Sequence, residues 1–297
     1  MNQPLTTAAL LAAFVALPAA PAAADFVLFG DPDPEAAELT RSTRAEPPMS
    51  QPYFSEDAMI TTDIRPYFLY HDFPNSSVIN GGRATVIAAQ VRVALTDSLQ
   101  FVAYKDGYTD LDTGLVSGEG LMDVAAGIKW AFLQDWENQF HLAGGVGYEF
   151  SLGDDEVLQD DDEVRLFLAG NKSFDKLHFS GTVNYFHPVD GEDALGDSSR
   201  ITWNLHADYA VTDWFAPVLE FNGFHVVDEG DNTPLPFIGV DVANLGGGQG
   251  EDVVTIAPGI AIRPTDNLSF RTAFETPITD NDDLFGYRWT FSAVIRF

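Results

Sequence analysis

The final stretch of the chain, residues 285–297, reads FGYRWTFSAVIRF and decides the fold. Its alternate positions carry the apolar or aromatic residues Phe285, Tyr287, Trp289, Phe291, Ala293, Ile295 and Phe297. The positions between them are mostly small or polar, and two of them are Arg288 and Arg296. A period of two residues places successive side chains on opposite faces of an extended chain. The stretch is therefore predicted to be a β-strand with one apolar and one polar face.

The same alternation recurs earlier in the chain. It is clear in the segments 122–132, 140–150, 201–211 and 254–263. Helical spacing at three and four residues fits none of them. From Ala58 onward the chain divides into roughly twelve amphipathic runs of this kind, which predicts an all-β fold.

The connections between these runs also alternate. Short turns, such as 96–98 and 212–213, are followed by long polar loops, such as 106–118 and 227–250. Aromatic residues gather near both kinds of connection, as the two interfaces of a membrane require. A soluble β-sandwich would alternate along its strands, but it has no reason to hold two aromatic bands. We therefore predict a transmembrane antiparallel β-barrel of about 12 strands, with short periplasmic turns and long extracellular loops.

Three prolines count against continuous strands, because a closed barrel has no free edge to accommodate a missing N–H. Pro66 and Pro217 are expected near strand ends, and a β-bulge is expected at Pro258.

The N-terminus predicts export. Residues 8–17 form a short apolar run, and Ala22 to Ala24 offer a cleavage site, so residues 1–24 are expected to be a signal peptide. No Lys or Arg precedes the run. Residues 25–57 are rich in Pro, Ala and Glu and are expected to be a periplasmic leader, either a mobile tail or a plug in the lumen. Residues 58–297 would then form the barrel in the bacterial outer membrane.

Composition excludes several classes of function. The formal net charge is −30, from 45 acidic and 15 basic residues, so nucleic acid is not an expected partner. The chain has no cysteine, so neither disulfides nor thiolate metal sites are expected. Acidic loops at the barrel mouths would attract cations, so we expect a pore to prefer them.

Two stretches resemble a known family. Residues 118–132 are similar to the "G-x-G-D-(hydrophobic)-x-x-G-x-K-(aromatic)" strand of outer-membrane proteins associated with the meta-pathway of phenol degradation, although Met122 interrupts the spacing. Residues 270–297 are similar to their last hairpin. The aromatic end also resembles the C-terminal strand of bacterial outer-membrane barrels, whose terminal Phe, here Phe297, is read by the assembly machinery. The resemblance implies a Gram-negative barrel that admits small organic compounds, and the family offers no established catalytic residues to carry over.

The polar strand faces carry the residues expected to matter for function. A charge facing lipid near the midplane would cost about 2–4 kcal/mol, so charged residues are expected to face the lumen. The predicted pore-lining residues are Arg92, Asp123, Lys129, Glu149, Arg165, His206, Asp208, Glu220, Arg271, Glu275 and Arg288. A barrel of eight strands has a lumen filled by side chains, and one of sixteen strands has an open channel. A barrel of about twelve strands lies between them, so the sequence allows either a conducting pore or a lumen closed by a network of charges.

No catalytic, cofactor or metal site is predicted. The acidic loop 154–163 lacks the spacing of a calcium-binding EF-hand, and the six histidines offer no close pair for zinc. Residues 196–199 faintly resemble an esterase signature, but without a partner His at a defensible spacing. The predicted function is an outer-membrane pore for passive passage of small solutes, including hydrophobic or aromatic organics. The alternatives are a lipid or lipopolysaccharide hydrolase using Ser198 and His206, or a non-conducting structural barrel.

The expected partners follow from this location. They are the lipid bilayer with its lipopolysaccharide, the assembly machinery acting through Phe297, and a small-molecule solute. A monomer is the expected state, because a closed barrel of this size can stand alone, and a trimer is the alternative.

Overall fold

The computed structural model describes residues 26–31, 43–77, 79–157, 162–189, 198–228, 252–280 and 285–297. Among them, no helix has the length and apolar character needed to cross a membrane. The strands are β1 (Asp63–Phe73), β2 (Gly82–Ala94), β3 (Leu99–Lys105), β4 (Tyr108–Thr113), β5 (Ser117–Leu121), β6 (Val124–Asp135), β7 (Phe140–Phe150), β8 (Glu163–Phe174), β9 (Leu177–Pro188), β10 (Ser199–Tyr209), β11 (Phe215–Asp228), β12 (Asp252–Thr265), β13 (Leu268–Pro277) and β14 (Tyr287–Arg296). A short 3-10 helix, η2, spans Asp155–Val157.

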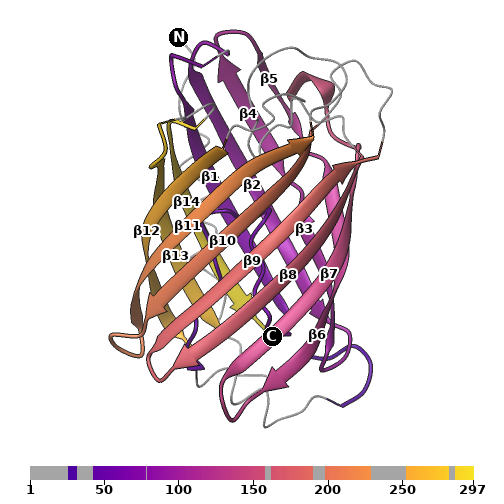
Figure 1. Ribbon diagram of the computed structural model, residues 1–297, viewed down its shortest axis with the longest axis vertical. Helices are drawn as coiled ribbons and strands as arrows, with labels where there is room; N and C mark the ends of the chain where they lie inside the picture. The colour runs from indigo at the N-terminus through magenta and orange to yellow at the C-terminus, as the bar shows by residue number, and fades with distance from the viewer. Residues whose placement is uncertain are drawn as a thin grey trace.

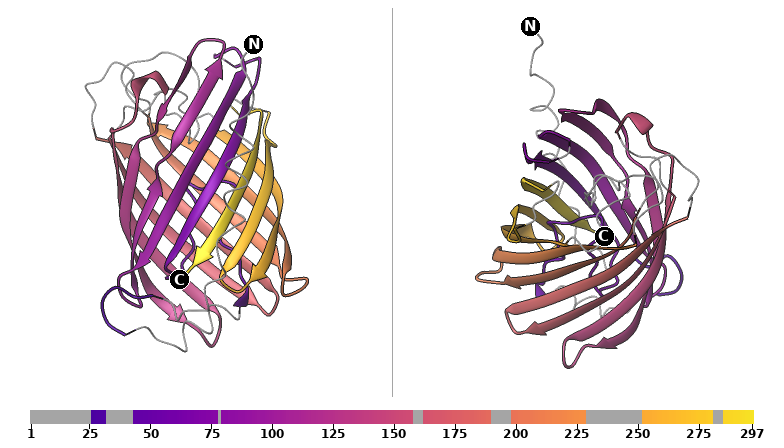
Figure 2. Two further views of the ribbon diagram at one scale, coloured as in Figure 1. Left: turned by 180° about the vertical axis from the view of Figure 1, so that it is seen from behind. Right: turned by 45° about the horizontal axis from the view of Figure 1, so that its top comes forward.

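The strands form one closed antiparallel barrel (Figure 1). Closure is made by β1, which pairs with β2 on one side and with β14 on the other. Figure 2 shows this seam, with the yellow β14 beside the indigo β1. The predicted all-β antiparallel barrel is confirmed.

Two of the strands around the wall are interrupted. β3 and β4 pair with successive parts of β2, and β6 and β5 pair in turn with β3 and β4. The fourteen described strands therefore make a wall of twelve, as predicted. Gly107 lies at the first interruption with φ of +129°, and a Cβ there would lie 2.7 Å from the Ile87 carbonyl oxygen. Only glycine fits this conformation without displacing backbone.

Short and long connections separate to opposite ends of the barrel, as the sequence predicts. The strands β8 and β9 are joined by Asp175 and Lys176 alone, whereas residues 229–251 separate β11 from β12. The prediction of a loop at residues 106–118 is wrong, because β4 and part of β5 lie within this range. There the chain extends the sheet as a hairpin instead of leaving it.

The outer face of the barrel is apolar and the inner face is polar. In β8, Leu166 and Leu168 are 51% and 64% exposed, while their inward-facing neighbour Arg165 is 1% exposed. Trp130 and Leu205 are likewise more than half exposed on the outside. A soluble protein has the reverse arrangement, whereas a barrel that spans a bilayer has this one.

The prolines lie where pairing with one neighbour lapses. The β1–β14 pairing skips Arg65 and Pro66, and the β12–β13 pairing skips Ala257 and Pro258. The register is the same on both sides of Pro258, so the bulge predicted there is wrong. The missing N–H is accommodated by a local gap in the hydrogen-bond ladder. Pro217 lies near the start of β11, as predicted.

Replacement of an outward side chain in mid-strand tests the membrane placement. Leu168→Arg should lower the free energy of unfolding from lipid vesicles by about 2–4 kcal/mol, because it places a charge in hydrocarbon. Leu152→Arg is the matched control, since Leu152 is 67% exposed but lies beyond the end of β7. Urea titration of both variants measures the difference. Equal, small effects would show that the outer face of β8 does not lie in hydrocarbon.

A lumen filled by the N-terminal segment

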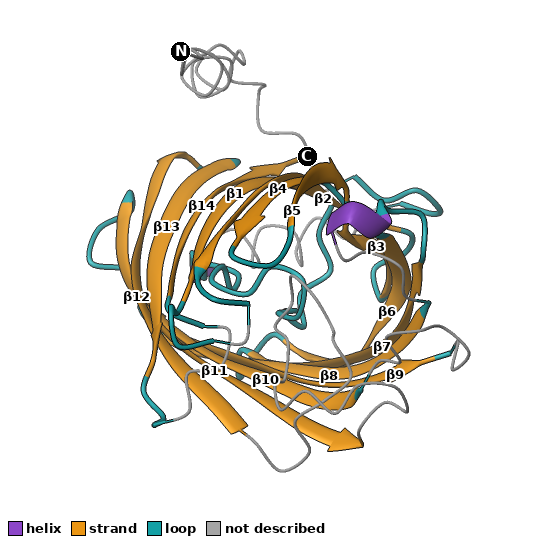
Figure 3. Ribbon diagram, turned by 90° about the horizontal axis from the view of Figure 1, so that it is seen from above, coloured by secondary structure: helices purple, strands orange, loops and turns teal. Residues whose placement is uncertain are grey.

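Residues 43–62, here called the plug, lie inside the barrel ahead of β1 (Figure 3). At its two ends the plug contacts the short-turn end of the wall, where Arg44 donates to the Asp213 carbonyl at 2.9 Å and the Phe297 N–H donates to the Thr62 carbonyl at 3.0 Å. Between these points a turn reverses the chain, with the Ser55 N–H donating to the Gln51 carbonyl at 2.9 Å. The plug is therefore a re-entrant loop that enters and leaves at the same end.

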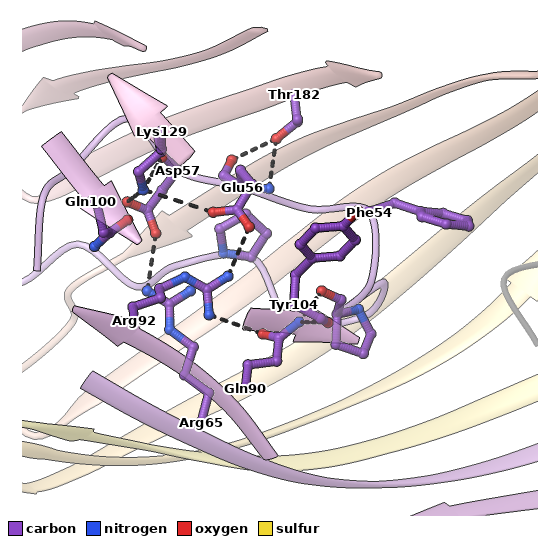
Figure 4. A network of polar contacts seen from close by, with 12 residues as sticks. Phe54, Glu56, Asp57, Arg65, Gln90, Arg92, Gln100, Tyr104, Lys129 and Thr182 are labelled. Atoms are coloured by element: carbon purple, nitrogen blue, oxygen red, sulfur yellow. Dashed lines mark hydrogen bonds and ion pairs between the residues drawn. The ribbon is translucent and has the colours of Figure 1, made fainter. Parts of the chain in front are cut away.

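Glu56 anchors the plug to a cluster of cations on the wall (Figure 4). Its carboxylate lies 3.0 Å from Arg92, 3.7 Å from Lys129 and 3.9 Å from Arg165. All four side chains are almost completely buried. Thr182 fixes the backbone of Glu56 by accepting its N–H at 3.0 Å and donating to its carbonyl at 2.5 Å. Opposite charges without water compensate each other only when they meet in this way.

Asp57 extends this cluster. Its carboxylate lies 3.3 Å from Arg65, and Lys129 donates to its backbone carbonyl at 2.9 Å. Arg65 is also paired with Asp63 of the wall at 2.7 Å. The plug thus brings two adjacent carboxylates to a wall rich in guanidinium and ammonium groups.

A second contact holds the backbone of the first half of the plug. Glu220 accepts the N–H groups of Met49 and Ser50, both at 2.8 Å. His206 lies between Glu220, at 2.7 Å, and Asp208, at 3.2 Å. Here wall carboxylates take the place of water as acceptors for backbone donors that would otherwise be buried without partners.

Further contacts continue around the lumen. Asp208 accepts the Glu46 N–H at 3.1 Å, and Arg271 donates to the Pro47 carbonyl at 2.7 Å. Gln51 donates to Glu275 at 2.7 Å and accepts from Arg288 at 3.0 Å. The plug is therefore held from strands on all sides of the barrel.

The tip of the plug is aromatic and meets an apolar part of the lumen. The Phe54 ring lies 4.9 Å from Phe186 and 5.8 Å from Phe224, measured between ring centroids. The Tyr53 ring lies 5.7 Å from Tyr67. These rings belong to one buried cluster that reaches Phe285 at the long-loop end.

All of the predicted pore-lining residues are buried on the inner side of the wall. Eight of them contact the plug in the ways just described: Arg92, Lys129, Arg165, Asp208, Glu220, Arg271, Glu275 and Arg288. The other three contact their neighbours: His206 bridges Asp208 and Glu220, Glu149 pairs with Lys105, and Asp123 accepts the Gly153 N–H. That they line a conducting pore stays a prediction.

Sequence reasoning missed the partners on the plug and the apolar cluster. Glu56 and Asp57 lie in a segment without alternation, so nothing in the pattern indicated which way they point. The signal for Phe186 was present, because it shares its strand face with the polar residues Thr182 and Asn184. An aromatic residue on an otherwise polar face indicates an apolar contact inside the lumen.

The hydrolase residues named from the sequence do not form a site. His206 is inside the lumen, and its two ring nitrogens contact Glu220 and Asp208, not Ser198. A different pair is close, since the Ser199 hydroxyl lies 2.9 Å from His187. Within the described ranges, no carboxylate contacts His187, so the third member of a catalytic triad does not follow.

Known proteins match this chain in structure alone. No family model and no curated protein matches the chain. Among solved structures, it is similar to the KdgM porin, with a TM-score of 0.45 and 10% identity over 79% of this chain and 99% of that one. It is also similar to the translocator domain of autotransporter NalP from Neisseria meningitidis, with a TM-score of 0.48 and 10% identity over 82% of this chain and 90% of that one. For the transport unit of autotransporter AIDA-I from Escherichia coli, the TM-score is 0.47 and the identity is 13% over 89% of this chain and 97% of that one.

These values are too low to carry a function from one protein to another, so we take the function from this chain's own residues. No sequence match supports the resemblance to the phenol meta-pathway proteins, which stays a prediction.

Cross-linking tests the position of the plug. The chain has no cysteine, so a pair introduced by Ser50→Cys and Asn222→Cys would be unique. The Ser50 hydroxyl lies 3.0 Å from the Asn222 amide nitrogen, so mild oxidation or a short bifunctional thiol reagent should join the two positions in nearly every molecule. Mass spectrometry of proteolytic peptides measures the yield.

The control pairs Ser50→Cys with Thr182→Cys. Thr182 is equally buried but contacts Glu56 instead of the first half of the plug. Similar yields from the two pairs would contradict a plug held in one position.

Proposed function

We propose that the protein is an outer-membrane channel for small organic solutes, held closed by residues 43–62 of its own chain. One observation carries the proposal: among the described residues, the carboxylate partners of Arg92, Lys129 and Arg165 are all on the plug. A purely structural barrel would pair such cations within its wall, as Arg200 is paired with Glu163.

The contacts of the plug suit a segment that leaves and returns. Most of them are hydrogen bonds and ion pairs to a polar wall, which water can replace when the plug moves. If the lumen were apolar, filling it with water after the plug had left would cost more free energy. The loop also enters and leaves at the short-turn end, so it can withdraw towards that end without passing its tip through the barrel.

Withdrawal of the plug changes the charge of the lumen. The carboxylates of Glu46, Glu56 and Asp57 leave with the plug, while the cations that they meet stay on the wall. The open lumen would therefore attract anions. The cation preference expected from the sequence rested on acidic loops, and much of the loops 153–162 and 227–250 lies outside the described residues.

A second candidate is a structural barrel in which the plug never leaves. The observation that favours it is the spread of the contacts, which reach Asp208 and Glu220 on one side and Glu275 and Arg288 on another. Conductance measurements separate this candidate from the channel.

Loss of one plug charge should open the channel. Glu56→Gln keeps the backbone contacts to Thr182 but removes the charge shared by three cations. A change of only about 1.4 kcal/mol between closed and open states is a tenfold change in population. In planar bilayers, we expect the open probability to rise at least about tenfold over that of the native chain, with a reversal potential showing anion preference in a potassium chloride gradient.

Two controls accompany this measurement. Glu119→Gln removes an exposed charge on β5 and should change nothing. Glu56→Gln combined with the cross-linked pair of Ser50→Cys and Asn222→Cys should be silent until the cross-link is reduced. If Glu56→Gln folds but stays silent with and without the cross-link, the structural barrel is favoured and the channel is not.

A further inference from the structure

The tip of the plug combines an aromatic ring and a carboxylate within three residues. Phe54 occupies a slot between Phe186 and Phe224, and Arg200 lies 5.6 Å from the Phe54 ring centroid. The walls of this slot come from β9, β10 and β11, so they belong to the barrel and remain when the plug withdraws. Edge-to-face and tilted ring contacts with a guanidinium alongside are favourable for any planar aromatic group.

Beside this slot, the carboxylate of Glu56 lies among Arg92, Lys129 and Arg165, a group here called the carboxylate seat. It does not use all of their hydrogen-bond donors. The Arg92 Nε and one terminal nitrogen of Arg165, Nη1, are buried without a hydrogen-bond partner. The second oxygen of Glu56, Oε2, also lacks a hydrogen bond, with Lys129 at 3.7 Å. A carboxylate fixed to the plug backbone therefore fits this seat incompletely. A free carboxylate could move to meet two donors at once, as guanidinium groups prefer.

One side chain joins the slot to the seat. Arg165 donates to the Phe54 carbonyl at 2.9 Å, lies 5.7 Å from the Phe186 ring centroid and lies 3.9 Å from the Glu56 carboxylate. The ring slot and the carboxylate seat are thus parts of one continuous site. Phe54 and Glu56 are two residues apart in the chain, so one short stretch of the plug fills both the ring slot and the carboxylate seat.

We propose that this site binds aromatic carboxylic acids, with the ring of the solute in the place of Phe54 and its carboxylate in the place of Glu56. The proposal deepens the function proposed above and rests on it, because the plug must withdraw for the solute to enter. A solute that binds only when the plug is out shifts the equilibrium towards the open state. The plug then acts as an internal mimic that keeps the site filled until a solute replaces it.

Binding can be measured on the full chain with the site vacated. Phe54→Ala combined with Glu56→Ala removes both mimicking groups and leaves the barrel wall unchanged. The probe is 3-phenylpropionate, and the matched controls are 3-phenylpropan-1-ol, which lacks the charge, and propionate, which lacks the ring. By isothermal titration in detergent, we expect 3-phenylpropionate to bind at least about tenfold more tightly than either control, a difference of about 1.4 kcal/mol. The native chain should bind it more weakly than the vacated variant.

Single changes in the wall assign the two halves of the site. In the vacated variant, Lys129→Gln should weaken binding of 3-phenylpropionate while leaving that of the alcohol unchanged. Phe186→Leu should weaken binding of both ring-bearing compounds and not that of propionate. Heat-modifiable electrophoretic mobility verifies folding of each variant before titration.

The outcomes distinguish this proposal from the channel. Conductance is measured in potassium chloride alone, so it does not depend on any organic solute. If Glu56→Gln conducts but the vacated variant binds 3-phenylpropionate no better than propionate, the aromatic-acid site is overturned and the channel stands. If 3-phenylpropionate binds selectively but no variant conducts, the site stands and transport through the lumen is overturned.

Discussion

Glu56 and the three cations around it, Arg92, Lys129 and Arg165, show the constraint on which the whole interior depends. The barrel wall cannot send these charged side chains outward, because the outer face meets hydrocarbon. Inside, they are too deeply buried to keep their water. Each charge must therefore meet a partner within the lumen, and removal of one partner leaves the others uncompensated. The plug supplies the missing partners, so it is an electrostatic part of the barrel as well as its closure.

The two faces of the wall obey different rules, and this separates what is fixed from what can move. The outer face needs apolar side chains such as Leu168 and a complete hydrogen-bond ladder, because lipid offers neither hydration nor partners. Gaps in the ladder at Pro66 and Pro258 are brief and leave the register intact. The inner face needs only that each polar group finds a partner, and water serves this purpose as well as the plug does. The wall is therefore rigid, whereas water and the plug can exchange as partners of the polar groups in the lumen.

The alternation of faces made the barrel predictable from the sequence, because it follows directly from strand geometry. The inward direction of Arg92, Lys129 and Arg165 followed from the same parity and from the cost of a charge in lipid. Their partners could not be predicted. Glu56 belongs to a segment with no repeating pattern, and its contacts join residues up to 126 positions apart in sequence, as in the hydrogen bonds with Thr182. Such pairings depend on closure of the barrel, which no local pattern specifies.

The chemistry of the plug tip explains why a closed lumen is compatible with transport. A segment that only blocked the barrel would be best held by a close apolar fit, since such packing leaves no donor without an acceptor. Around Glu56, in contrast, Arg92 Nε, Arg165 Nη1 and the second carboxylate oxygen of Glu56 itself all lack a hydrogen bond. This imperfect fit weakens the closed state relative to the best that the wall could form. A wall with unused donors beside an aromatic slot is better matched by a mobile ligand than by its own tethered carboxylate, and that difference in fit is what would drive exchange.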